Sequence, residues 1–263
     1  MTKVLFKSIV CLLGIGLLGS TLNAQVEVPF TPRLDNSYIN IKGDYTFLAN
    51  SILNRVDGSN TANDPYNGNN NNNNFHRDYI DIDGDPSTFS SSSSTLTLPD
   101  CTRIYWAGLY WSANYQQEVM NNTQISGLPN NDSRRLDFRQ IKFKVPGGSY
   151  IDIVADNNPD PVGEEDAVIH DDVNFKDSPY TCFANVTNQL QALANPAGEY
   201  TVANVRATRG VSVGGAGGWT LVVIYENPTL TGKYISVFDG YAGVSGNSSA
   251  DINVSGFNTI PSG

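Results

Sequence analysis

Apolar and polar residues alternate along several stretches of the chain, and this two-residue period is typical of β-strands. The strongest stretch is residues 219–225, a run of β-branched and aromatic side chains that follows Gly217 and Gly218. Successive side chains in a strand point to opposite faces, and here both sets are largely apolar. The run is therefore predicted to be an interior strand that is covered on both faces.

Similar strand patterns recur at short intervals, separated by residues that favour turns. They occupy residues 36–48, 95–98, 101–112, 138–145, 150–154, 199–207, 233–240 and 249–257. Residues 138–145 and 150–154 are predicted to pair as a hairpin around Pro146, Gly147 and Gly148. Gly43 interrupts the first stretch and suggests a β-bulge.

One segment, residues 182–193, has the period of a helix. Phe183, Val186, Leu190 and Leu193 fall at positions i, i+3, i+7 and i+10. Many short strands with turn signals and a single helix favour an all-β fold. We predict a β-sandwich, jelly-roll-like, with one short helix.

The first 24 residues have the features of a secretory signal peptide. Lys3 and Lys7 precede a short apolar run over residues 9–19, and Ala24 offers the small residue that a signal peptidase prefers. The apolar run is too short for a comfortable membrane span. Cys11 lies inside this run and not at the cleavage point, which argues against a lipoprotein. The mature chain is predicted to begin at Gln25 and to be exported.

Residues 25–263 are predicted to form a single domain, because no linker rich in proline or serine divides them. Within them, residues 55–78 are polar and low in complexity, and residues 69–74 are all asparagine. Such a segment cannot bury enough apolar area to offset its ordering entropy. We expect a disordered loop there.

The mature chain is acidic. The whole sequence carries a formal charge of −10, and loss of the two leader lysines leaves 14 basic against 26 acidic side chains, a charge of −12. This balance argues against nucleic acid and anionic lipid as partners. The mature sequence contains no second apolar stretch long enough to span a bilayer, so an extracellular protein is expected.

Two cysteines, Cys101 and Cys182, remain after cleavage. An exported chain folds in a compartment where disulfides form, so a Cys101–Cys182 disulfide is the preferred interpretation. The alternative is two separate buried thiols that fill core volume.

Asp81, Asp83 and Asp85 resemble the first half of a calcium loop, because closely spaced carboxylates supply several of the oxygen ligands that Ca²⁺ requires. The full EF-hand spacing is not met: Gly84 comes too early, and Ser92 stands where the twelfth-position glutamate belongs. Acidic residues between positions 164 and 172 could complete a site. The alternative is a solvated turn after a strand.

The sequence offers little support for catalysis. His76 and His170 have no partner at metal-ligand spacing, and no G-x-S-x-G elbow is present. The glycine-rich residues 214–218 precede a strand, whereas a phosphate-binding loop follows one. Four aromatic residues within positions 105–111 could stack on a sugar, although core packing is the favoured interpretation.

Several segments carry a family resemblance. They are residues 42–46 (KGDYT) and 49–51 (ANS), 81–88 (DIDGDPST), 105–111 (YWAGLYW), 217–228 (GGWTLVVIYENP) and 237–241 (VFDGY). Together they resemble the N-terminal module of large surface proteins of Flavobacterium-type gliding bacteria, among them gliding-motility adhesins exported by type IX secretion. The segments at 217–228 and 237–241 are the most specific.

The resemblance implies a non-enzymatic, secreted or cell-surface module that contributes to adhesion or gliding. It further implies that the chain is the N-terminal part of a longer protein with repeats and a C-terminal sorting domain; without that domain, a periplasmic location is expected. An alternative is a calcium-dependent carbohydrate-binding module, with Asp81, Asp83 and Asp85 as metal ligands and the aromatic residues as the sugar platform. An exported hydrolase is the least favoured hypothesis.

Overall fold

The computed structural model describes residues 25–56, 75–114, 119–120, 123–124, 138–156, 168–171, 179–211, 216–243 and 249–256. The predicted signal peptide lies outside these ranges, as do residues 57–74 of the asparagine-rich segment. In the described part the chain is an all-β sandwich with one short helix, as the periodicity predicts.

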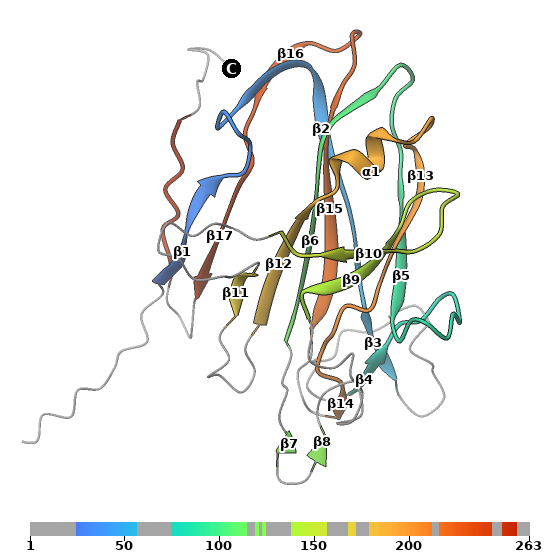
Figure 1. The fold of residues 1–263 in the computed structure, drawn as a ribbon. Helices are drawn as coiled ribbons and strands as arrows, with labels where there is room; N and C mark the ends of the chain where they lie inside the picture. Colours follow the sequence, from blue (N-terminus) through green and yellow to red (C-terminus); the bar gives the residue numbers. More distant parts are fainter. Residues whose placement is uncertain are drawn as a thin grey trace, which may run out of the picture.

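A six-stranded antiparallel sheet forms the centre of the molecule (Figure 1). In spatial order its strands are β11 (Val168–Asp171), β12 (Pro179–Asn185), β6 (Arg103–Asn114), β15 (Gly217–Glu226), β2 (Ile39–Ser51) and β16 (Gly232–Ile235). The glycine-led run at 219–225 is thus an interior strand, paired with β6 on one side and with β2 on the other. This confirms the prediction for that stretch.

Two smaller sheets cover the two faces of the central sheet. The inner face packs against a four-stranded sheet whose order is β10 (Ile151–Val154), β9 (Gln140–Lys144), β13 (Gly198–Ala203) and β5 (Ser91–Leu96). On the outer face lies a two-stranded ribbon of β1 (Gln25–Pro32) and β17 (Phe238–Gly243), here called the outer ribbon. Figure 1 shows the two layers on opposite sides of β6 and β15.

Short strands lie at one end of the sandwich. They are β3 (Leu53–Val56), β4 (His76–Tyr79) and β14 (Gly210–Val211) in one sheet, and β7 (Val119–Met120) and β8 (Thr123–Gln124) in another. The predicted hairpin at residues 138–154 is confirmed, because β9 and β10 pair around the turn at Pro146 and Gly147.

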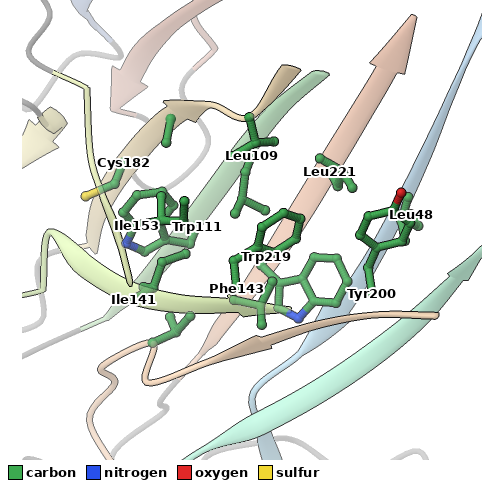
Figure 2. Packing of buried hydrophobic residues seen from close by; sticks show 14 of the residues in the cluster. Leu48, Leu109, Trp111, Ile141, Phe143, Ile153, Cys182, Tyr200, Trp219 and Leu221 are labelled. Atoms are coloured by element: carbon green, nitrogen blue, oxygen red, sulfur yellow. The ribbon is translucent and has the colours of Figure 1, made fainter. Parts of the chain in front are cut away.

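The main core fills the space between the central sheet and the four-stranded sheet. Trp111 and Trp219 face each other across the β6–β15 pair and are almost fully buried, and Phe143 and Tyr200 meet them from the opposite sheet (Figure 2). Each large ring removes roughly 150–250 Å² from water, so these side chains dominate the stability of the sandwich. The Nε1 atoms of Trp111 and Trp219 donate to the Phe138 carbonyl at 3.0 Å and to Ser92 Oγ at 2.9 Å.

A second, smaller core lies between the central sheet and the outer ribbon. It contains Ile224, Trp106 and Phe183 from the sheet, with Ile41 and Ile235 beside them. Gly108 leaves room for this packing, because a Cβ atom there would overlap the ring of Trp106. Both faces of the central strands are therefore apolar because each face packs against a core.

The helix prediction is wrong at its N-terminal half. Residues 179–185 form β12, and only Thr187–Gln191 is helical (α1). Tyr180, Cys182 and Ala184 face the main core, whereas Phe183 faces the second core. Burial on both faces of a sheet leaves apolar residues at positions that also fit a helical period.

Four other predictions need correction. The stretch 233–240 is divided between β16 and β17, which belong to different sheets, and residues 249–256 form no strand. The ends of the expected disordered loop, within residues 53–56 and 76–79, pair as β3 and β4. Gly43 causes no bulge, because the register between β2 and β15 is continuous; a Cβ atom there would instead overlap the Tyr225 carbonyl oxygen.

Among the described residues, no helix is both long enough and apolar enough to cross a membrane.

Candidate binding surface

The outer face of the central sheet has a hollow where the outer ribbon does not reach. It has a volume of about 410 Å³ and is bounded by segments of β2, β6, β12 and β15, here called the sheet hollow. Strand alternation directs the side chains of Ser112, Thr181 and Thr220 into it, and the small residues Ala49 and Gly218 keep it open. The described residues that line it include no acidic or basic side chain.

Two exposed aromatic side chains, Tyr45 and Phe47, precede Ala49 of the sheet hollow on the same face of β2, and we call them the aromatic pair. Tyr45 is 57% exposed and Phe47 is 68% exposed. Both lie on the outer face of β2, on the same side as Ala49, and Phe47 sits directly opposite Val222 of β15. Side chains two residues apart on one face of a strand are about 7 Å apart.

The aromatic pair is exposed because the elements next to β2 are shorter than β2 itself. The N-terminal part of β2 is covered, and Ile39 and Ile41 are buried in the second core. Strand β16 pairs with β2 only over residues 39–42. Beyond Gly43 the same apolar face of β2 continues, but neither β16 nor the outer ribbon accompanies it.

An ion-paired clamp closes the end of the sheet hollow that borders the outer ribbon. Arg33 donates from Nε and Nη2 to the carboxylate of Asp239, each at 2.6 Å, and Tyr110 donates its hydroxyl to the same carboxylate at 2.9 Å. The Arg33 guanidinium also lies 4.4 Å from the ring centre of Phe183. Burial, and then the charge of Asp239, raise the pKa of Tyr110 well above its usual range. Tyr110 is therefore a fixed, neutral wall of the hollow.

The hydroxyl groups in the sheet hollow differ in their hydrogen-bond partners. Ser112 Oγ donates to the Tyr180 carbonyl at 2.6 Å and accepts from Thr181 Oγ1 at 3.3 Å. The Thr220 hydroxyl forms no hydrogen bond with the described residues, and it remains half-buried in the lining. The surface therefore combines uncharged hydroxyl groups with aromatic rings.

The predicted calcium ligands lie in one loop, on the side of the molecule away from the sheet hollow. Asp81 accepts a hydrogen bond from Ser91 Oγ at 2.9 Å, where the loop joins β5. Asp83 accepts from Thr88 Oγ1 at 3.1 Å and from the Tyr150 hydroxyl. Asp85 accepts from the Ser87 backbone N–H at 2.8 Å. Donors from the loop, from β5 and from Tyr150 thus engage an oxygen of each carboxylate.

Hydrogen bonds also shift the pKa values of the carboxyl groups in this loop. Burial alone would raise the pKa of Asp83, but donation from Tyr150, the Asp85 N–H and Thr88 outweighs it and lowers the pKa below its usual value. The Ser87 N–H and side chain lower the pKa of Asp85. In the part of the chain that the structure describes, no three acidic, histidine or cysteine side chains gather as a metal group. The acidic residues 164–166 lie outside the described ranges.

The predicted disulfide does not form. Cys101 is exposed in the turn before β6, while Cys182 is buried in the centre of β12, opposite Trp111 (Figure 2). Arg103 begins β6, and Trp111 lies eight residues further along it, so roughly 25 Å of extended strand lies between the turn that holds Cys101 and the strand partner of Cys182. A disulfide requires Cα atoms within about 7 Å. The prediction failed because an expected export makes a disulfide possible, whereas the presence of two cysteines in a sequence is no evidence that they lie close together.

Apart from Tyr110, the aromatic residues and histidines that the sequence offered as candidates lie in the two cores or on separate strands. Trp106 and Trp111 are buried in the two cores, which confirms core packing over sugar stacking for these two rings. Tyr105 is 38% exposed at a β-bulge of β6, away from the sheet hollow. His76 is exposed on β4, and the backbone of His170 lies in β11 on the opposite edge of the central sheet.

Sequence reasoning missed the aromatic pair as a site. Its alternation with polar neighbours continues the pattern of Ile39 and Ile41, which predicts a buried face. What distinguishes Tyr45 and Phe47 from Ile39 and Ile41 is that no apolar residues of a neighbouring element continue over them. Whether such residues are present depends on where β16 and β17 end. Those ends were not predicted, because residues 233–240 were treated as one strand.

The segments that carry the family resemblance build the framework around this surface. Asp239 clamps the outer ribbon, and Gly43 allows close approach of β2 to β15. Asn227 is fully buried and donates to the Asp100 carbonyl at 2.9 Å, joining the β15–β16 turn to the start of β6. The chain matches no known family model, no curated protein and no solved structure.

Proposed function

We propose that the chain is a non-enzymatic, exported surface module that contributes to adhesion or gliding, as the N-terminal part of a longer protein. The resemblance of five segments to the N-terminal modules of gliding adhesins supports this proposal. The acidic composition and the leader-like residues 1–24 are those of an exported protein. Surface binding requires a rigid scaffold with an accessible contact area, and the sandwich has both.

The observation that carries the proposal is the aromatic pair beside an uncharged hollow. Contiguous exposed apolar surface is characteristic of binding sites, and the two rings of the aromatic pair lie next to each other on one strand face. They project from the central sheet, whose strands have packed cores behind them, so little ordering is needed on binding. General acid–base chemistry requires titratable groups, and the described lining of the hollow contains no such side chain except the neutral Tyr110.

Adhesion by the purified mature chain tests the proposal. Residues 25–263 would be coupled to fluorescent beads, and bead retention on bacterial cells and on polysaccharide-coated glass would be measured under flow. Beads that carry the chain should be retained several-fold more than beads that carry a charge-matched inert protein. Equal retention would overturn the adhesion proposal, and turnover of a polysaccharide or peptide library would overturn the non-enzymatic one.

A second candidate is a calcium-dependent carbohydrate-binding module. The observation that favours it is that Asp81, Asp83 and Asp85 share one loop, where their carboxylates lie close together in the chain. Ca²⁺ that binds only the folded state should raise the melting temperature. A melt that is unchanged at millimolar Ca²⁺ would exclude this candidate.

A further inference from the structure

We infer that the sheet hollow and the aromatic pair form a calcium-independent site for a neutral glycan, in which Tyr45 and Phe47 stack on sugar rings. The inference rests on the proposed adhesive function and names its ligand class. It uses a different part of the molecule from the aspartate loop.

The aromatic pair supplies the stacking platform. Phe47 is 68% exposed and Tyr45 is 57% exposed, although both lie on the apolar face of a strand in the central sheet. Their spacing of about 7 Å along one face lets a linear chain of sugar rings contact both. The apolar faces of sugar rings and the faces of aromatic rings bury each other, and the sugar hydroxyls remain free at the rim.

The sheet hollow supplies polar groups next to the platform. Its volume of about 410 Å³ falls in the usual range of ligand sites, roughly 300–1,000 Å³. Thr220 lies opposite Ala49 on the strand next to the aromatic pair, and its hydroxyl has no hydrogen-bond partner among the described residues. Ser112 and Thr181 add two more hydroxyl groups that can accept from a ligand. Such uncharged donors and acceptors match those of a sugar.

The charge of the chain and the small exposed apolar area favour a neutral glycan over a polyanion or a protein partner. A polyanion would meet residues 25–263, whose 14 basic and 26 acidic side chains give a net charge of −12, and no basic side chain is present in the described lining. A stable protein interface buries about 800 Å² on each partner, whereas the exposed apolar area here is limited to two rings and a small hollow. The aspartate loop is tied to β5 and Tyr150 in the four-stranded sheet, on the other side of the central sheet.

Titration of variants with defined oligosaccharides tests the inference. The probes are neutral tetrasaccharides of glucose, mannose and galactose, with a uronic-acid tetrasaccharide as the anionic comparison, each in EDTA and in Ca²⁺. Wild-type residues 25–263 should bind at least one neutral probe equally in both buffers. Phe47→Ala and Tyr45→Ala should each weaken binding about tenfold. The matched control is Tyr234→Ala, which removes a 49% exposed tyrosine that points to the opposite face.

Two further variants test the hollow itself. Ala49→Trp fills it from an exposed position and should abolish binding, whereas Thr220→Val should weaken binding by several-fold with no change in melting temperature. The inference is overturned if no neutral probe binds, if EDTA removes binding, if only the uronic-acid probe binds, or if Phe47→Ala and Tyr234→Ala bind alike. Bead adhesion that persists in Phe47→Ala would leave the proposed function standing without this glycan site; absence of wild-type adhesion would remove both.

Discussion

At the scale of single residues, the outer ribbon is held by one carboxylate. Asp239 receives both donors of Arg33 and the Tyr110 hydroxyl, and the two ion-paired side chains are only 16% and 11% exposed. Gly240, the next residue, packs against the β1 backbone, where a Cβ atom would lie 2.7 Å from the Val28 carbonyl oxygen. The segment VFDGY thus positions the second core and one wall of the sheet hollow.

Asp239→Asn should lower the free energy of unfolding by about 2–4 kcal/mol, because it leaves the partly buried Arg33 without a counter-charge. Urea denaturation at pH 7 measures the change. Asp152→Asn is the matched control, since it breaks a surface pair with Lys142 in which Asp152 is 57% exposed, and it should cost less than about 1 kcal/mol. Equal losses in the two variants would show that the clamp contributes no more than a surface ion pair.

Asn227 shows what the sequence can and cannot reveal about a residue. The pair Asn227-Pro228 marks the end of a strand in the sequence, and the strand does end there. The sequence gives no sign that Asn227 is fully buried and bonded to Asp100 and Thr102. Those partners lie more than 100 positions away, and single-sequence patterns report only local preferences.

At the scale of elements, the β2–β15 pair depends on a close backbone approach at Gly43. Gly43→Ala should destabilise the protein by about 1–3 kcal/mol or more, because its Cβ atom would overlap the Tyr225 carbonyl oxygen. Thermal melting measures this effect. Gly232→Ala, on the neighbouring strand β16, is the control: its Cβ atom would meet nothing nearer than 4.0 Å. A similar melting temperature for the two variants would show that the backbone at Gly43 moves at no cost.

Strand periodicity predicted most central elements but not their ends or their sheets. The strands within residues 101–112 and 219–225 were recognised because both of their faces are apolar, although β6 begins only at Arg103. The same property misled the interpretation of residues 182–193, where apolar residues on two strand faces imitate one helical face. The division of residues 233–240 at Ser236 and Val237 was not predictable, because no glycine or proline marks it.

At the scale of the whole molecule, the topology separates the two cysteines that composition would pair. Cys101 should react with a thiol reagent in the native protein, whereas Cys182 should react only after unfolding, because it is fully buried. Mass spectrometry after native and denaturing alkylation measures both. Non-reduced protein that resists alkylation at both positions in denaturant would contradict the structure and restore the disulfide.

The candidate site depends on how separate elements are arranged in the whole molecule, and for that reason the sequence alone could not predict it. Tyr45 and Phe47 fit a buried pattern, and they are exposed because neither the paired strand β16 nor the outer ribbon continues alongside this part of β2. The predicted aspartates were correctly placed in one loop, yet their oxygens accept from neighbours whose positions depend on tertiary structure, above all Tyr150. Residue types indicated possible chemistry, and the arrangement of layers determined which residues are accessible.

The response to acid reflects the acidic charge and the fold together. Hydrogen bonds hold the pKa of Asp44, Asp83 and Asp85 below the ordinary value of 3.8 in the folded chain. Their stabilisation is complete above that value, and it is lost as the pH falls through the lower folded pKa values. The urea midpoint should therefore be nearly constant from pH 7 to 5 and should fall below about pH 4.

Tyr150→Phe isolates one contribution to this acid response. The variant removes a donor to Asp83, so the pKa of Asp83 should rise toward its ordinary value and the variant should be less stable than wild type at pH 7. The difference should shrink as the pH falls below about 4, where protonation removes the same stabilisation from wild type. Tyr105→Phe, an exposed tyrosine on β6, should follow wild type throughout. A difference between Tyr150→Phe and wild type that stays constant from pH 7 to 3 would show that the Tyr150 hydroxyl stabilises the loop independently of the Asp83 charge.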